Sequence, residues 1–233
     1  MSNTGKLTGF FSLLVFLVIL YASYLLILLS LPYIHFKPGV EFLKTKQLIY
    51  HIDLWRYSFY IHVFSSPLII LPGLLQFNRY LIHRQRKTHK ILGYIYIIVL
   101  LTISGPAAVV MAFYANGGYV SQVSFVILSI LWILFTLLAF YNIKKGKTEA
   151  HVKWMIRSYA LTLSAITLRF YAYVFDIFGL SLGPKETYWL LAYMSWIPNL
   201  LIAQLIISLN YPRYLLRYEN NINHEPLDQK SSQ

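Results

Sequence analysis

Two arginines and three histidines fall in or beside stretches of sequence that are otherwise apolar enough to cross a membrane. Arg157 and Arg169 belong to the stretch that begins at His151, and His62 and His89 belong to two earlier stretches. An arginine near the centre of a bilayer costs roughly 2.5–3.5 kcal/mol on insertion scales, so it usually faces a protein interior and has a specific partner there. These five residues are therefore the first candidates for a functional site.

The chemistry that this set favours is the binding of a b-type haem. Histidines on membrane helices ligate haem iron, and arginines pair with the haem propionates. On this interpretation His62, His89 and His151 are candidate ligands, and the pair of His89 and His151 could hold the iron or another metal. Arg157 and Arg169 would bind the propionates, a quinone or another anionic ligand. The first functional hypothesis is thus a redox membrane protein associated with haem or quinone.

The same residues leave other functions open. A transporter would use Arg169, His62 and Asp176 as its polar path. A non-enzymatic binding protein would recognise an anionic lipid or small molecule through Arg157 and the basic loops. Purely structural roles are also open: Arg157 can extend its guanidinium to the membrane surface, and Arg169 can pair with Asp176 two helical turns away.

The composition indicates an integral membrane protein. Of the 233 residues, 58% are hydrophobic and 12% are charged. The net charge of +12 does not indicate nucleic-acid binding, because basic residues of membrane proteins gather in cytoplasmic loops. The chain has no cysteine, which excludes disulfides and thiolate metal sites formed by this chain alone. The common motifs of soluble phosphate-binding and hydrolytic enzymes are absent, so the sequence leaves open whether the protein is an enzyme.

The elements that must position the candidate residues are six membrane-spanning helices. Apolar stretches of sufficient length lie near 8–32, 57–77, 91–114, 120–142, 153–176 and 188–209. Prolines inside the second, third and sixth stretches predict kinks. We expect an all-α integral membrane protein in which residues 1–217 form a single six-helix transmembrane bundle, followed by a disordered cytoplasmic tail over residues 218–233.

The distribution of charge predicts that both termini face the cytoplasm. The connections 79–90 and 144–153 and the start of the tail are rich in lysine and arginine, and all three lie on one side of a six-span chain. The connection around 116–119, on the other side, is uncharged. The connection 33–56 departs from this pattern, since it carries four basic residues against two acidic ones.

A helical rise of about 1.5 Å per residue places the polar residues at two depths. The outer layer holds His62 and Arg169 at a similar depth in the outer half, with Asp176 nearby in depth. Asn199 falls near the middle of the membrane. The inner layer lies at the cytoplasmic boundary and comprises His89, His151, Arg157, Trp154 and Gln76. We therefore expect two polar sites, one in each half of the bundle, with membrane lipids around them and no nucleic-acid partner.

The motifs around these residues resemble those of one known family. They are Thr88-His89-Lys-Ile-Leu-Gly93-Tyr-Ile-Tyr96 with Ser104-Gly105-Pro106, His151-Val-Lys-Trp154-Met-Ile-Arg157 with Leu168-Arg169, Trp196-Ile-Pro198-Asn199, and His62 with Gln76-Phe77. Together they resemble the bacterial polytopic membrane family named domain of unknown function 2306, over about residues 55–205. The resemblance implies a multi-pass protein of the bacterial inner membrane and implies no particular activity. It adds weight to the two arginines and three histidines as a functional set.

Overall fold

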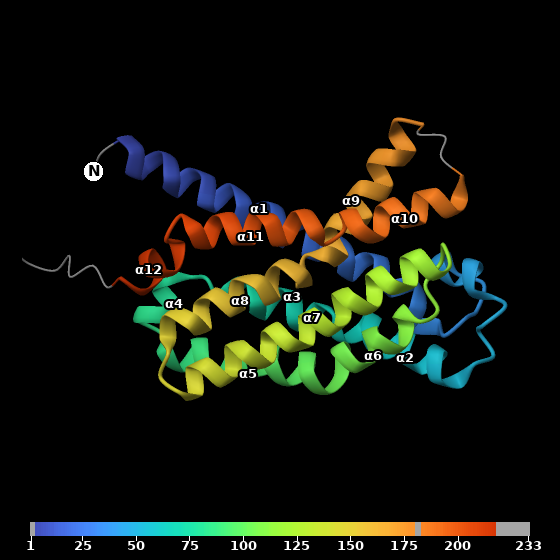
Figure 1. The fold of residues 1–233 in the computed structure, drawn as a ribbon, viewed down its shortest axis with the longest axis horizontal. Coiled ribbons are helices and arrows are strands. Elements are labelled where there is room, and N and C mark those ends of the chain that lie inside the picture. The colour runs from blue at the N-terminus through green and yellow to red at the C-terminus, as the bar shows by residue number, and fades with distance from the viewer. Residues whose placement is uncertain (1–2, 180–182, 218–233) are drawn as a thin grey trace, which may run out of the picture.

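The computed structural model of the protein describes residues 3–179 and 183–217, and all regular structure in those ranges is helical (Figure 1). Six segments are long and apolar enough to cross a membrane, which confirms the predicted fold class. These spans are Leu13–His35, Asp53–Leu75, Arg86–Ala112, Tyr119–Lys144, Thr148–Ile177 and Lys185–Ser208. The tail predicted to be disordered, residues 218–233, lies outside the described residues.

Four of the six spans each contain two α-helices. The two-helix spans are α2 (Asp53–Ser65) with α3 (Pro67–Leu75), α5 (Arg86–Val99) with α6 (Gly105–Ala112), α8 (Thr148–Thr162) with α9 (Ser164–Ile177), and α10 (Pro184–Met194) with α11 (Ile197–Ser208). A π-helical segment, η3 (Leu100–Ser104), joins α5 to α6. The first span is α1 (Asn3–Ser30) with the short η1 (Leu31–His35), and the fourth is the continuous α7 (Tyr119–Lys144). Three short helices complete the described fold: η2 (Glu41–Lys46), α4 (Arg79–His83) and α12 (Tyr211–Leu216).

The interruptions within the spans have local causes. Pro67, Pro106 and Pro198 each occupy the first turn of the second helix in their span, where proline lacks the N–H that would continue the preceding helix. The break at Leu163, between α8 and α9, was not predicted because neither proline nor glycine marks it. There the Asn199 amide donates to the Ala160 carbonyl at 3.1 Å, which satisfies an acceptor at the break.

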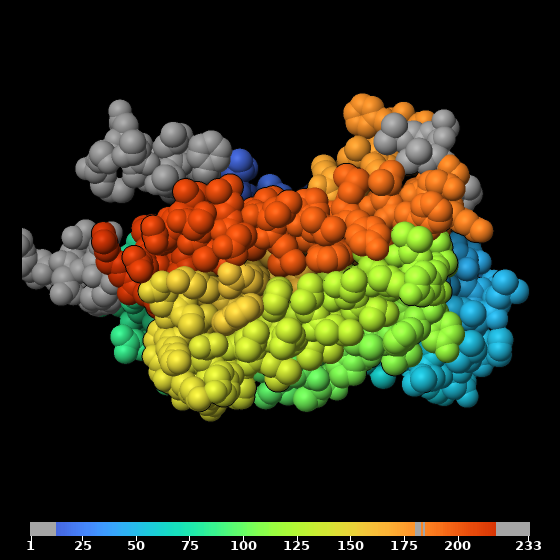
Figure 2. Space-filling model, viewed as in Figure 1, coloured from blue at the N-terminus to red at the C-terminus, as the bar shows by residue number. Residues whose placement is uncertain are grey.

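The spans pack around one central core. α7 lies along α8, α3 lies against α5, and α2 lies against α6. Ile69, Tyr96, Leu100 and Leu161, from three different spans, are fully buried where these helices meet. In the space-filling view, α7, α8 and α11 form a continuous face of the bundle (Figure 2).

The two ends of the bundle can be told apart by their connections. α1 begins and α12 ends at the same end, as an even number of spans requires (Figure 1). We call this the inner end; by the charge pattern it is predicted to face the cytoplasm. The opposite end, which carries η2, is the outer end.

Candidate functional site

A cavity of about 560 Å³ lies in the outer half of the bundle, and all six spans contribute to its wall. The wall is mostly apolar and includes the side chains of Phe59, Met111 and Trp132. His62 and Arg169 also line it, so the structure brings these two candidates, which are 107 positions apart in the sequence (169 − 62), to one site. We call this space the outer cavity.

The breaks in the spans are located on or beside the outer cavity. Ser66, Ser164 and Ser195 lie at the breaks of the second, fifth and sixth spans and line the cavity wall. Ser104, at the end of the π-helical segment, contacts His62, which also lines the wall. Non-helical backbone at membrane depth is tolerated where it is buried in protein or faces a polar cavity. The interrupted helices therefore have their breaks at the outer cavity or beside it.

Arg169 is held by its own helix and not by an acidic partner. Its Nη1 donates to the Ala165 carbonyl, one turn earlier on α9, at 2.8 Å. Asp176 is exposed two turns further on, and no ion pair joins it to Arg169 in the described part of the chain. The pairing of Arg169 with Asp176 that the sequence left open is thus not formed. The guanidinium keeps most of its hydrogen-bonding capacity for a ligand in the outer cavity.

His62 is fixed in one orientation at the cavity wall. Its Nδ1 lies 3.2 Å from both the carbonyl oxygen and the hydroxyl oxygen of Ser104, and its ring lies edge-on to Trp132 with 6.4 Å between the ring centroids. These contacts use one ring nitrogen, so Nε2 is left to donate to or accept from a ligand. His62 is therefore both a helix-to-helix contact and a polar group of the site.

Lys46 is a cavity residue that the sequence analysis did not single out. It lies on η2, in the segment 36–52 that joins the first span to the second, which we call the outer connection. Its side chain is 4% exposed and donates to the Tyr114 carbonyl. Burial lowers the pKa of Lys46 from 10.5 to about 8, because the charged ammonium is removed from water. Glu41 is the acidic side chain in the cavity wall, and it is exposed. The excess of basic residues in an outer connection was the only signal that pointed to Lys46.

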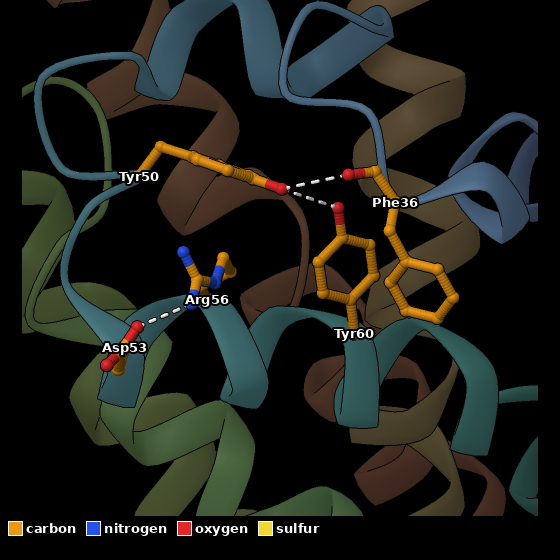
Figure 3. A network of polar contacts seen from close by, with 5 residues as sticks. All are labelled: Phe36, Tyr50, Asp53, Arg56 and Tyr60. Atoms are coloured by element: carbon orange, nitrogen blue, oxygen red, sulfur yellow. Dashed lines mark hydrogen bonds and ion pairs between the residues drawn. The ribbon is translucent and has the colours of Figure 1, made fainter.

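The outer connection is tied to the bundle by a polar network (Figure 3). The Tyr50 hydroxyl donates to the Phe36 carbonyl at 3.1 Å and lies 3.1 Å from the Tyr60 hydroxyl on α2. Arg56 pairs with Asp53 at 2.5 Å in the first turn of α2. The segment that carries Lys46 is therefore anchored over the outer end of the cavity.

A layer of buried hydroxyl groups closes the outer cavity on its inner side. The Tyr96 hydroxyl lies 2.7 Å from the Ser158 hydroxyl and 2.8 Å from that of Thr162, which also lines the cavity. Trp132 Nε1 donates to Thr162 at 2.9 Å, and Thr136 lies 2.7 Å from Ser158. The layer joins α5, α7 and α8 and separates the outer cavity from the inner histidines.

His89 and His151 lie close together at the inner end, as a second polar site. His89 belongs to α5 and His151 to the neighbouring α8, and Gln76 donates to the His89 carbonyl at 3.3 Å. His151 Nδ1 lies 2.8 Å from the Ala139 carbonyl of α7, whereas the buried Nδ1 of His89 has no hydrogen-bond partner among the described residues. His62 does not join this pair, and the described residues include no group of three metal-ligating side chains.

Arg157, Trp154 and Asn199 lie on other faces of the helices. Arg157 Nη2 donates to Gln204 of α11 at 2.8 Å, and its guanidinium lies 4.7 Å from the centroid of the Trp154 ring. The Asn199 amide donates to the Ala160 and Ser195 carbonyls and to Thr167, each at 3.1 Å. These contacts hold α11 against α8 and α9, and they place Arg157 and Asn199 outside both polar sites.

The sequence model of a family described as a predicted membrane protein (DUF2306) matches residues 59–207, which is well over half of the chain. The matched region contains His62, Arg169, His89 and His151, whereas Lys46 and the cavity-lining residues of the first span lie outside it. Comparisons with curated proteins and with solved structures gave no match. The match agrees with the resemblance seen in the motifs around His62, His89, His151 and Arg169, and it shows that the chain belongs to the DUF2306 family of membrane proteins.

Proposed function

We propose that the protein binds a long-chain amphiphile with an acidic head group, a carboxylate or a phosphate, in the outer cavity. The single observation that carries this proposal is Arg169, which lines the cavity without an acidic partner in the described part of the chain. A guanidinium in a medium of low dielectric constant is stabilised by an anion, and its planar fork matches a carboxylate or a phosphate.

The charges around the cavity support an anionic ligand. Arg169 and Lys46 contribute two cations to the wall, against the exposed Glu41 as its acid. His62 adds a ring nitrogen that can form a hydrogen bond with an acidic head group. A net positive site with a second hydrogen-bonding group favours anions over neutral polar molecules.

The size and lining of the cavity support a long apolar chain. Its volume of about 560 Å³ lies within the range typical of small-molecule sites, roughly 300–1,000 Å³. Aromatic and aliphatic side chains cover most of the wall, so burial of a hydrocarbon chain there is favourable at roughly 25 cal/mol per Å². A net positive charge and an apolar wall together are the properties expected of a site that binds or transports such amphiphiles.

The proposal is tested by direct binding to the purified protein in lipid nanodiscs. Trp55 and Trp132 line the cavity, so a dibrominated stearate should quench their fluorescence on binding. The matched alcohol should bind more weakly, and the matched alkyl phosphate tests which acidic head is preferred. Absence of saturable quenching by either acid would overturn the proposal.

Two variants of the fifth span make the test specific. Arg169→Gln should weaken stearate binding by roughly 10- to 100-fold, because hydrogen bonds to charged groups contribute about 1.5–3 kcal/mol. Arg157→Gln is the matched control, since Arg157 lies on the same span and donates to Gln204 away from the cavity. It should bind stearate as the wild type does.

A second candidate function, haem binding at the inner end, is favoured by one specific observation. His151 Nδ1 contacts a backbone carbonyl, which leaves Nε2 as a lone-pair donor, the usual arrangement of a metal-ligating histidine. The neighbouring His89 has a buried Nδ1 without a partner among the described residues. Two such imidazoles on α5 and α8 are the ligand type that b-type haem uses.

The visible spectrum of the protein expressed with haem supply tests this second candidate. Haem ligation predicts Soret and alpha bands that are lost in His89→Ala and His151→Ala but kept in His51→Ala, a change in the exposed outer connection. A folded and colourless wild-type protein would exclude it. Electron transfer to or from a quinone would be examined only after such bands are seen.

The proposed location is the bacterial inner membrane, with the inner end of the bundle toward the cytoplasm. The apolar spans and the family support a multi-pass membrane protein. The basic connections at the inner end support the orientation.

A further inference from the structure

A second, smaller cavity of about 50 Å³ adjoins the outer cavity on the side of α1. Its wall is formed by α1, by α2 with α3, and by α9, and it includes Ser23 and Ile27 of α1. His62, Ala165 and Arg169 line both cavities, so the two spaces meet at the polar residues of the site. The small cavity therefore lies between α1 and α9 and meets the outer cavity at Arg169.

α1 and α9 flank the small cavity, and no hydrogen bond joins these two helices in the described part of the chain. None of the residues of α9 is buried, and Phe170 and Tyr173 are 58% and 65% exposed. The hydroxyls of Ser23 and Ser30 donate to carbonyls of α1 itself, so neither ties α1 to a neighbouring helix. In Figure 1, α9 leans away from the rest of the bundle toward its outer end. Separating α1 from α9 would break few polar contacts.

The outer end of the cavity is more firmly closed. The Asn116 amide donates to Thr45 of the outer connection at 3.0 Å and to Tyr188 of α10 at 3.1 Å. Lys46 donates to the Tyr114 carbonyl in the same region. Opening this end would break hydrogen bonds between three segments, and local opening favours the region with the fewest such contacts.

We propose that the ligand reaches Arg169 laterally from the bilayer, between α1 and α9, and that it is a membrane-resident lipid acid. This inference rests on the proposed function, because it concerns the same site. An amphiphile with a long chain resides in the bilayer, so a lateral path spares it passage through water. The acidic head then meets Arg169 and His62 where the two cavities join.

Loading and release kinetics of dibrominated stearate, measured by stopped-flow tryptophan quenching in nanodiscs, test the route. Ile27→Phe and Leu71→Phe place bulk in the small cavity from α1 and from α3 without adding a tryptophan, and neither residue lines the outer cavity. Both variants should slow loading and release by about tenfold or more, with an unchanged dissociation constant. Leu28→Phe makes a comparable change on α1 at a position 40% exposed and outside the small cavity, and it should keep wild-type rates.

The possible outcomes distinguish failure of the lateral route from failure of ligand binding in the outer cavity. Wild-type rates in both Ile27→Phe and Leu71→Phe overturn the lateral route while binding itself stands. An altered dissociation constant with an unchanged loading rate also overturns it, because the change would then act on the site. No saturable binding to the wild-type protein overturns the proposed function and the route together.

Discussion

At the scale of single residues, Arg157 and Arg169 lie on the same span but have different surroundings. Arg157 stacks on Trp154 and donates to Gln204, so its polar groups have protein partners. Arg169 donates to a carbonyl of its own helix and lines a cavity. Spacing along the span predicted the depth of both arginines. It could not predict their partners, because those depend on the rotation of α8 and α9 and on residues of distant spans.

Lys46 shows the other limit of sequence analysis at this scale. It lies in a connection with no regular hydrophobic pattern, and its burial depends on the fold of the outer connection over α2.

The lowered pKa of Lys46 predicts how the free energy of unfolding depends on pH. Between pH 8 and 10.5 the unfolded chain binds a proton at this position that the folded protein does not, so the free energy of unfolding should rise with pH in that window.

Thermal unfolding of detergent-solubilised protein between pH 8 and 9.5 measures this effect, with the upper limit set roughly below the ordinary tyrosine pKa. Lys46→Met should remove this contribution to the rise. Lys44→Met changes an exposed lysine on the same short helix and should retain it. Equal slopes in the two variants would show that Lys46 is not the group responsible.

At the scale of elements, Pro67, Pro106 and Pro198 marked interruptions that the structure contains, whereas Pro72, also expected to interrupt the second span, lies inside α3. The break of the fifth span at Leu163 had no such mark. It depends on tertiary contacts, since Thr167 donates to the Ser195 carbonyl at 2.5 Å and Asn199 donates to Ala160. Local sequence therefore accounts for breaks caused by a missing N–H, whereas it cannot reveal a break stabilised by another span.

The close approach of α3 to α5 and α8 depends on Gly73. A Cβ at this position would lie 2.6 Å from ring atoms of Tyr159 and 2.8 Å from the ring of Tyr96. Both rings are held by hydrogen bonds of their hydroxyls, so they cannot move away freely. Gly73→Ala should therefore destabilise the protein by about 1–3 kcal/mol, the usual cost of overpacking.

Thermal unfolding in detergent measures this change as a lower midpoint temperature. Gly39→Ala is the control, because a Cβ there meets no atom within 4 Å. A wild-type midpoint in Gly73→Ala would mean that α3 can shift without loss of packing.

At the scale of the whole molecule, apolar length and composition were sufficient to predict a helical bundle of six spans. The hydrophobic stretches predict helices without tertiary information, since isolated backbone polar groups are not tolerated in lipid. The outer cavity could not be predicted, because its wall combines side chains from all six spans. The predicted orientation rests on charge alone and can be measured separately.

The absence of native cysteine allows a clean test of that orientation. Tyr119, at the start of α7 on the outer end, is 80% exposed, and Lys145 is exposed just beyond its inner end. In intact cells a membrane-impermeant maleimide should label Tyr119→Cys, whereas Lys145→Cys should react only after permeabilisation. The reverse pattern would place the outer cavity on the cytoplasmic side.

The central claim is that Arg169 recognises the acidic head of a ligand in the outer cavity. Its most direct test is the ratio of the dissociation constants of dibrominated stearyl alcohol and dibrominated stearate, measured for Arg169→Gln and Arg157→Gln beside the wild type. The account predicts that the wild type and Arg157→Gln prefer the acid by roughly tenfold or more, and that Arg169→Gln loses this preference. A preference for the acid that survives in Arg169→Gln, or that is lost equally in Arg157→Gln, would contradict it.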